Sequence, residues 1–130
     1  MDVEKIQDQI DSTNYWDAKI LDVRASYFCD EIEIFMECDE KYLWKFKFEA
    51  CNEVQYFTDA VKRKKILYVK NMNLRQMGYY GQSIIVSKSD VYPLIKFEIN
   101  LSLINIRIEC LNFILSKELK KGISFWWDIN

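Results

Sequence analysis

Histidine is absent from this 130-residue sequence. Its absence excludes Ser-His-Asp triads, Cys-His pairs, imidazole proton shuttles and histidine metal ligands. Glycine and proline are scarce, with three glycines and one proline against average usage of about 7% and 5%. So few glycines leave no P-loop and no dinucleotide-binding fingerprint. We therefore expect a protein that is not an enzyme, has no catalytic residues and uses no cofactor.

Closely spaced cysteines are lacking too. The four cysteines stand 9, 13 and 59 positions apart, and no Cys-X-X-Cys motif occurs. A zinc site of four thiolates normally needs at least one short-spaced pair, so we expect reduced thiols and no metal. Cys110 continues an inward strand face and is interpreted as a small buried hydrophobic residue.

The sequence contains neither a signal-peptide pattern nor a long apolar run. Residues 1–4 are acidic where a signal peptide is basic, and no apolar stretch approaches the roughly 18 residues of a membrane span. We expect a cytoplasmic protein that does not interact with membranes.

Charge is divided unevenly along the chain. Residues 1–40 hold twelve acidic and three basic residues, whereas residues 41–130 hold eight acidic and fifteen basic ones. The two parts attract each other within the fold, form faces of opposite sign that steer partners, or are simply solvated surface.

No linker, low-complexity segment or repeat divides the sequence, so we expect a single domain over residues 1–130. Apolar residues recur at helical spacing over residues 3–12, where Asp2 can cap a short amphipathic helix. From residue 17 the period becomes two, which predicts strands at 18–24, 31–37 and 43–49.

The second and third strands pass a register test. If the numbers of facing residues add to 80, apolar side chains share one face and Glu33 faces Lys47 on the other. An antiparallel hairpin is predicted, with residues 38–42 as its loop.

A second hairpin is predicted near the C-terminus. If facing residues add to 205, Lys96 meets Glu109 and Glu98 meets Arg107, so both charge pairs are complementary. Its turn lies around residues 101–104.

The remaining segments complete a mainly β (α+β) fold. Residues 82–88 and 112–115 are predicted strands, and residues 52–70 fit a second helix better than an extension of the third strand. The fold class is therefore an antiparallel sheet, two-layered or a partly closed barrel, with a short N-terminal helix.

The densest set of carboxylates lies at the second strand and its loop. A general acid needs a desolvated pocket, which an outer strand face does not provide, so catalysis by this set is disfavoured. Solvated surface is the simplest interpretation, and the functional one is docking of a basic protein surface. The candidate partner-binding residues are Glu31, Glu33, Phe35, Glu37, Asp39 and Glu40.

Other charged and aromatic segments favour structural roles. The basic run at residues 62–65 resembles a phosphate-binding strip, but an acidic first third makes the chain a poor ligand for nucleic acid. The Gly78–Gly81 segment could hold tyrosines at a surface, although tyrosine more often packs with a wet hydroxyl. If Trp126 and Trp127 sit in a strand, one is buried and the other is at the surface.

Several stretches resemble a group of small bacterial proteins that occur beside polymorphic-toxin genes and are regarded as immunity proteins. The stretches are residues 15–20, 30–34, 44–51 and 106–110. The resemblance implies a cytoplasmic protein that binds and blocks a toxin domain and has no chemistry of its own. The alternative is a sheet or barrel that binds a small molecule in an incompletely filled interior. A homodimer through exposed strand edges is a further possibility.

Overall fold

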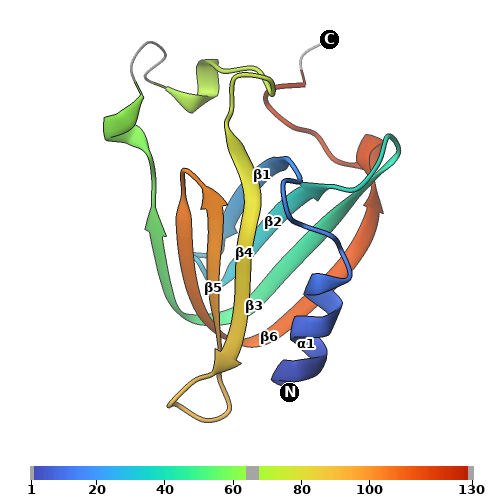
Figure 1. Ribbon diagram of the computed structural model, residues 1–130. Coiled ribbons are helices and arrows are strands. Elements are labelled where there is room, and N and C mark those ends of the chain that lie inside the picture. The colour runs from blue at the N-terminus through green and yellow to red at the C-terminus, as the bar shows by residue number, and fades with distance from the viewer. Residues whose placement is uncertain (1, 64–67, 129–130) are drawn as a thin grey trace.

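The computed structural model describes residues 2–63 and 68–128. One α-helix precedes six strands (Figure 1). The elements are α1 (Val3–Asp11), β1 (Ile20–Ser26), β2 (Glu31–Glu37), β3 (Tyr42–Phe57), β4 (Tyr79–Lys88), β5 (Ile95–Ser102) and β6 (Asn105–Leu119). Three short 3-10 helices are found at Ala60–Lys62, Val69–Asn71 and Lys120–Gly122.

All strands belong to one antiparallel sheet in the order β1-β2-β3-β6-β5-β4. The predicted mainly β class with a short N-terminal helix is confirmed. Asp2 caps α1 as expected, because its side chain accepts a hydrogen bond from the Glu4 backbone N–H at 3.0 Å.

Both predicted hairpin registers are confirmed. In the first, Glu33 lies opposite Lys47 and Ile34 opposite Phe46. In the second, Lys96 lies opposite Glu109 and Glu98 opposite Arg107. Segregated faces and complementary charge pairs therefore fixed each register.

The second helix predicted at residues 52–70 is wrong for residues 52–57, which belong to β3, and the described part of the remainder forms only the short 3-10 helices Ala60–Lys62 and Val69–Asn71. β3 continues to Phe57, and its final part pairs with the first part of β6, with Val54 opposite Ile108. The alternation of Val54 and Tyr56 on one side suits this partner strand, so pairing overrides the helical pattern. Residues 64–67 lie outside the described residues.

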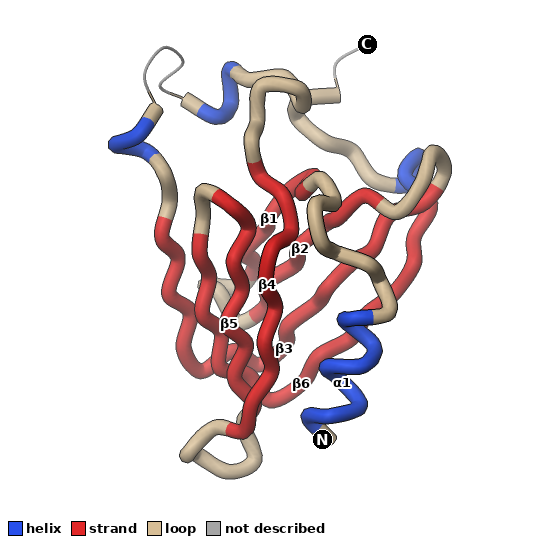
Figure 2. Tube along the Cα trace, viewed as in Figure 1, coloured by secondary structure: helices blue, strands red, loops and turns tan. Residues whose placement is uncertain are grey.

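β6 is also longer than expected. The separate strand predicted at 112–115 is the middle of β6, which continues to Leu119. β3 bends where Ala50 adopts a left-handed φ of 52° and the register shifts between Cys51 and Glu53. The two long strands thus carry the sheet through its bend (Figure 2).

The inner face of the bent sheet holds the main core. Phe48, Phe97 and Phe113 pack together, with ring centroids 4.8–5.1 Å apart. Ile6 and Ile10 of α1 are buried against the same cluster. The helix therefore covers one side of the concave core (Figure 1).

β4 and β1 approach each other without forming a continuous ladder. The only bridge between them within the described chain joins Lys19 and Tyr80. Gln7 of α1 bonds to the outer edge of β4, donating to the Ile84 carbonyl and accepting from the Val86 N–H, both at 2.8 Å. The sheet is therefore partly rolled but open, and α1 lies along the outer edge of β4.

The C-terminal segment after β6 packs on the outer face of the sheet. Phe125 is 8% exposed and forms a second apolar cluster with Leu21, Phe35 and Leu43. The Trp127 indole N–H donates to the Leu21 carbonyl at 2.8 Å. This segment is not a strand, yet Trp127 is partly buried in the second cluster while Trp126 is 37% exposed.

Candidate functional site

The predicted acidic face of β2 is a ladder of ion pairs. Glu31 lies 3.4 Å from the Lys47 ammonium, and Glu33 lies 3.7 Å from that of Lys45. Glu37 lies 3.5 Å from the Lys120 ammonium. Each of these three carboxylates from the acidic first part of the chain thus has a lysine partner from the basic remainder. The interpretation that the two parts attract each other within the fold is supported by these pairs.

Phe35 does not lie exposed among these carboxylates, and this expectation is wrong. Its side chain is 2% exposed and meets the Phe125 ring edge to face, with centroids 5.8 Å apart. The Arg24 guanidinium lies 4.7 Å from the centre of the Phe35 ring. The C-terminal segment buries this ring, which the pattern of β2 alone did not indicate.

Asp39 and Glu40 lie in the exposed β2–β3 loop. The Asp39 carboxylate accepts hydrogen bonds from the backbone N–H groups of Tyr42 and Lys41, at 2.8 and 2.9 Å. These bonds hold the pKa of Asp39 below its usual range. The Asp39 carboxylate therefore stabilises the turn of the loop, whereas the Glu40 side chain is exposed to solvent.

The turn between β1 and β2 is a feature that the sequence analysis missed. Tyr27, Phe28 and Cys29 are consecutive residues with left-handed φ angles of 54°, 57° and 70°. The Tyr27 side chain is 74% exposed, and that of Phe28 is fully exposed at 107%. The signal available in the sequence was a pair of adjacent aromatic residues between two predicted strands.

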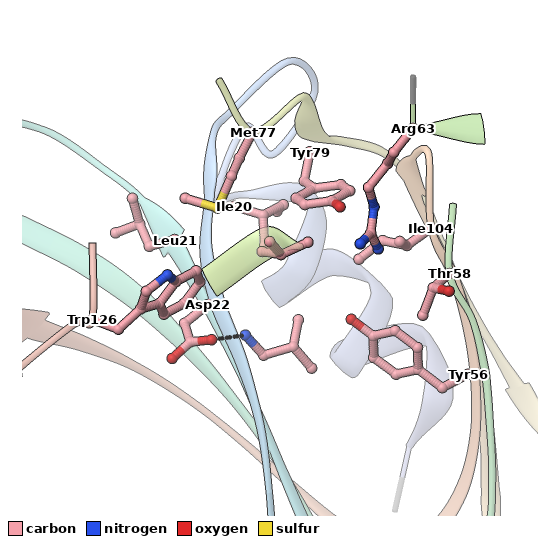
Figure 3. A pocket seen from close by; sticks show the side chains of 12 residues that line it. Ile20, Leu21, Asp22, Tyr56, Thr58, Arg63, Met77, Tyr79, Ile104 and Trp126 are labelled. Atoms are coloured by element: carbon pink, nitrogen blue, oxygen red, sulfur yellow. Dashed lines mark hydrogen bonds between the residues drawn. The ribbon is translucent and has the colours of Figure 1, made fainter. Parts of the chain in front are cut away.

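A cavity of about 230 Å³ opens near the start of β1 (Figure 3). Tyr56 and Tyr79 point into it, and Arg63 lies at its edge. The Tyr79 hydroxyl donates to Asp59 at 2.8 Å, and burial with this carboxylate raises the pKa of Tyr79 to about 12. This cavity is smaller than the roughly 300 Å³ at which ligand pockets begin, so its volume gives little support to a small-molecule site, and two larger hollows of about 370 and 640 Å³ are more open to solvent.

The predicted basic run takes part in the same cluster. The Arg63 guanidinium lies 3.1 Å from the buried Asp59 carboxylate, so Arg63 has a structural partner. Lys62 is exposed, and Lys64 and Lys65 lie outside the described residues. The tyrosines of the Gly78–Gly81 segment begin β4 and are partly buried rather than displayed on a loop.

Two thiols are unsuited to nucleophilic chemistry. Burial raises the pKa of Cys51 to about 11 and that of Cys110 to about 12, so both stay protonated at neutral pH. Cys110 is 0% exposed, as predicted for a small core residue. Within residues 2–63 and 68–128, no cluster of three metal-ligating side chains occurs, and no helix is long and apolar enough to cross a membrane.

One family of known proteins matches most of the chain, including the ion pairs of β2 and β3 and the β1–β2 turn. The model of a family described as immunity protein PIM7 matches residues 2–117. The matched region contains α1, β1 to β5 and most of β6. No curated protein matches the sequence.

Proposed function

The chain belongs to the immunity protein PIM7 family, and we propose that it acts by binding a protein toxin and blocking it without chemistry of its own. The family match over residues 2–117 is the observation that carries this function. The protonated thiols and the ion-paired carboxylates support a binding role over a catalytic one.

We propose that the toxin docks on the outer face of β2 and β3, at the end next to the β1–β2 turn. This docking face consists of Glu31, Glu33, Lys45, Lys47 and Glu49. Each of these side chains keeps 24–29% of its surface exposed. The C-terminal segment packs against Phe35, which lies opposite Lys45, and it still leaves the side chains of Lys45 and Glu33 24% exposed.

The docking face suits a basic partner because its ion pairs are weak and exchangeable. Exposed ion pairs contribute about 0–1 kcal/mol, so a lysine or arginine of the toxin can replace Lys45 or Lys47 at little cost. Three carboxylates against two ammonium groups also leave the face net negative. Opposite potentials then raise the rate of association.

The other predicted residues contribute differently to this proposal. Glu37 lies at the other end of β2, where it pairs with Lys120, and Phe35 serves the core. Asp39 and Glu40 lie beyond that end and add negative charge at longer range, where screening by salt is strong.

The test uses the toxin domain encoded beside the gene, since the similar proteins occur beside toxin genes. Affinity is measured by titration calorimetry for the wild type and for Glu31→Lys/Glu33→Lys, and growth protection is scored on co-expression. We expect the double variant to bind at least tenfold more weakly, with a slower association rate.

Glu98→Lys is the matched control, because Glu98 is an exposed strand carboxylate on β5. We expect it to bind within twofold of the wild type, and circular dichroism checks that both variants fold. A wild-type chain that fails to bind the toxin domain contradicts the proposed function. Unchanged affinity in the double variant removes the docking face alone.

A further inference from the structure

The β1–β2 turn presents two aromatic rings that the fold does not use. Tyr27 and Phe28 are 74% and 107% exposed. Within the described residues, neither ring takes part in an aromatic or cation–π contact. We call Tyr27, Phe28 and Cys29 the aromatic tip.

The backbone of the aromatic tip is strained by its own side chains. All three residues have left-handed φ angles between 54° and 70°, a conformation that glycine adopts freely and bulky residues disfavour. Glycine or asparagine at these positions would serve the turn better. The residues therefore oppose the local conformation and gain no burial in return, which indicates selection for something outside the fold.

The strained turn is nevertheless firmly held. The Asp30 N–H donates to the Tyr27 carbonyl at 3.0 Å, and the Cys51 N–H donates to the Asp30 carbonyl at 3.0 Å. These bonds tie the aromatic tip to the bend of β3. A backbone held in this way loses little conformational freedom when a partner covers the two rings.

We propose that the aromatic tip is the apolar anchor of the toxin interface, with Tyr27 and Phe28 entering an apolar pocket that has a basic rim. This inference rests on the proposed function and identifies the chemistry of the partner surface. Exposed, rigid aromatic residues supply much of the binding energy in protein interfaces. Asp30 follows the tip and is exposed, and Glu31 of the docking face comes next, so negative charge surrounds the rings. A basic rim complements that charge.

The experiment separates the rings from the strain. Phe28→Gly and Tyr27→Gly remove one ring each and relieve the left-handed backbone. We expect each to keep a Tm at or above the wild-type value while binding the toxin domain at least thirtyfold more weakly. A variant that gains stability but loses affinity is the signature of a residue kept for a partner.

Two controls isolate the cause. Ala50→Gly relieves a left-handed φ of 52° without removing a ring, and Tyr92→Ala removes a ring that is 93% exposed in the β4–β5 loop. We expect both to bind within twofold of the wild type. Phe28→Trp keeps an aromatic ring and should retain most of the affinity.

Failure of this inference differs from failure of the proposed function. If the wild type binds the toxin domain and Phe28→Gly and Tyr27→Gly bind equally well, the docking function stands and the aromatic tip is not its anchor. If Ala50→Gly weakens binding as much as Phe28→Gly, the rings are not the cause and the inference is overturned. If the wild type does not bind, both fall.

Discussion

Gly81 of β4 lies directly against the backbone of Tyr15, so that a Cβ on Gly81 would overlap the Tyr15 carbonyl oxygen. The contact follows from two hydrogen bonds that join this loop to β4. The Asp17 N–H donates to the Gly81 carbonyl at 2.7 Å, and the Gly81 N–H donates to the Ala18 carbonyl at 2.9 Å. A bare backbone at position 81 is what lets the loop before β1 reach β4.

Gly81→Ala should therefore destabilise the protein by about 2–3 kcal/mol, because the loop must move away from β4. Urea denaturation followed by circular dichroism measures the change. Gly122→Ala is the control, since a Cβ there meets nothing within 4 Å. Equal free energies of unfolding for the two variants would show that the loop before β1 can move away from β4 without loss of stability.

Gln7→Ala should cost about 2 kcal/mol, because both hydrogen bonds to the β4 backbone are lost together. The Val86 amide should also exchange its hydrogen faster in deuterated water. Gln9→Ala, on the exposed side of the same helix, is the control and should change stability little. Undiminished protection of Val86 in Gln7→Ala would contradict the role given to this side chain.

Phe125→Ala should cost about 3 kcal/mol, because it removes the ring that covers Phe35 and Leu43. Trp126→Ala removes a side chain that is 37% exposed and should cost less. Chemical denaturation of both variants gives the comparison. Equal losses would mean that the C-terminal segment does not depend on the buried ring.

Glu109 should make stability depend on acid pH. Hydrogen bonds from the Ser89 hydroxyl at 2.6 Å and the Asn52 amide at 2.7 Å hold its pKa below the usual range. The folded state then releases this proton more readily than the unfolded state, so the stabilisation is present at neutral pH. It is lost as pH falls below about 4, the ordinary range for a glutamate.

Glu109→Gln is the variant that tests this dependence. The wild type should exceed it in free energy of unfolding at pH 7, and the difference should shrink toward pH 3. Denaturation at several pH values measures the gap, and Glu98→Gln on the neighbouring strand should show no such trend. A gap that is constant with pH would locate the acid sensitivity elsewhere.

The two hairpins could be predicted to the residue because their information is local. A slip of one position would turn every side chain of β2 to the wrong face and set Glu33 against the wrong neighbour. The prediction for residues 52–57 was wrong because the information that decides their structure is not local. Their partner is the first part of β6, about fifty residues later, and nothing within the segment itself identifies that strand.

The candidate site divides in the same way. Its carboxylates were placed correctly on the outer side of β2, yet their lysine partners were only partly foreseen, because Lys120 comes from a distant segment. The burial of Phe35 depends on Phe125, ninety positions later. The aromatic tip was missed because tyrosine, phenylalanine and cysteine normally avoid positive φ angles, so their presence does not predict a left-handed turn.

The side chain of Gln7 has a consequence for self-association. Its amide nitrogen donates to the Ile84 carbonyl and its amide oxygen accepts from the Val86 N–H, so it binds the β4 backbone as a peptide group of a neighbouring strand would. Lifting α1 would therefore present β4 as a template onto which a strand of a second copy can add. Helix α1 thus covers the β4 edge against pairing between copies, and a variant without α1 should self-associate more readily at high concentration.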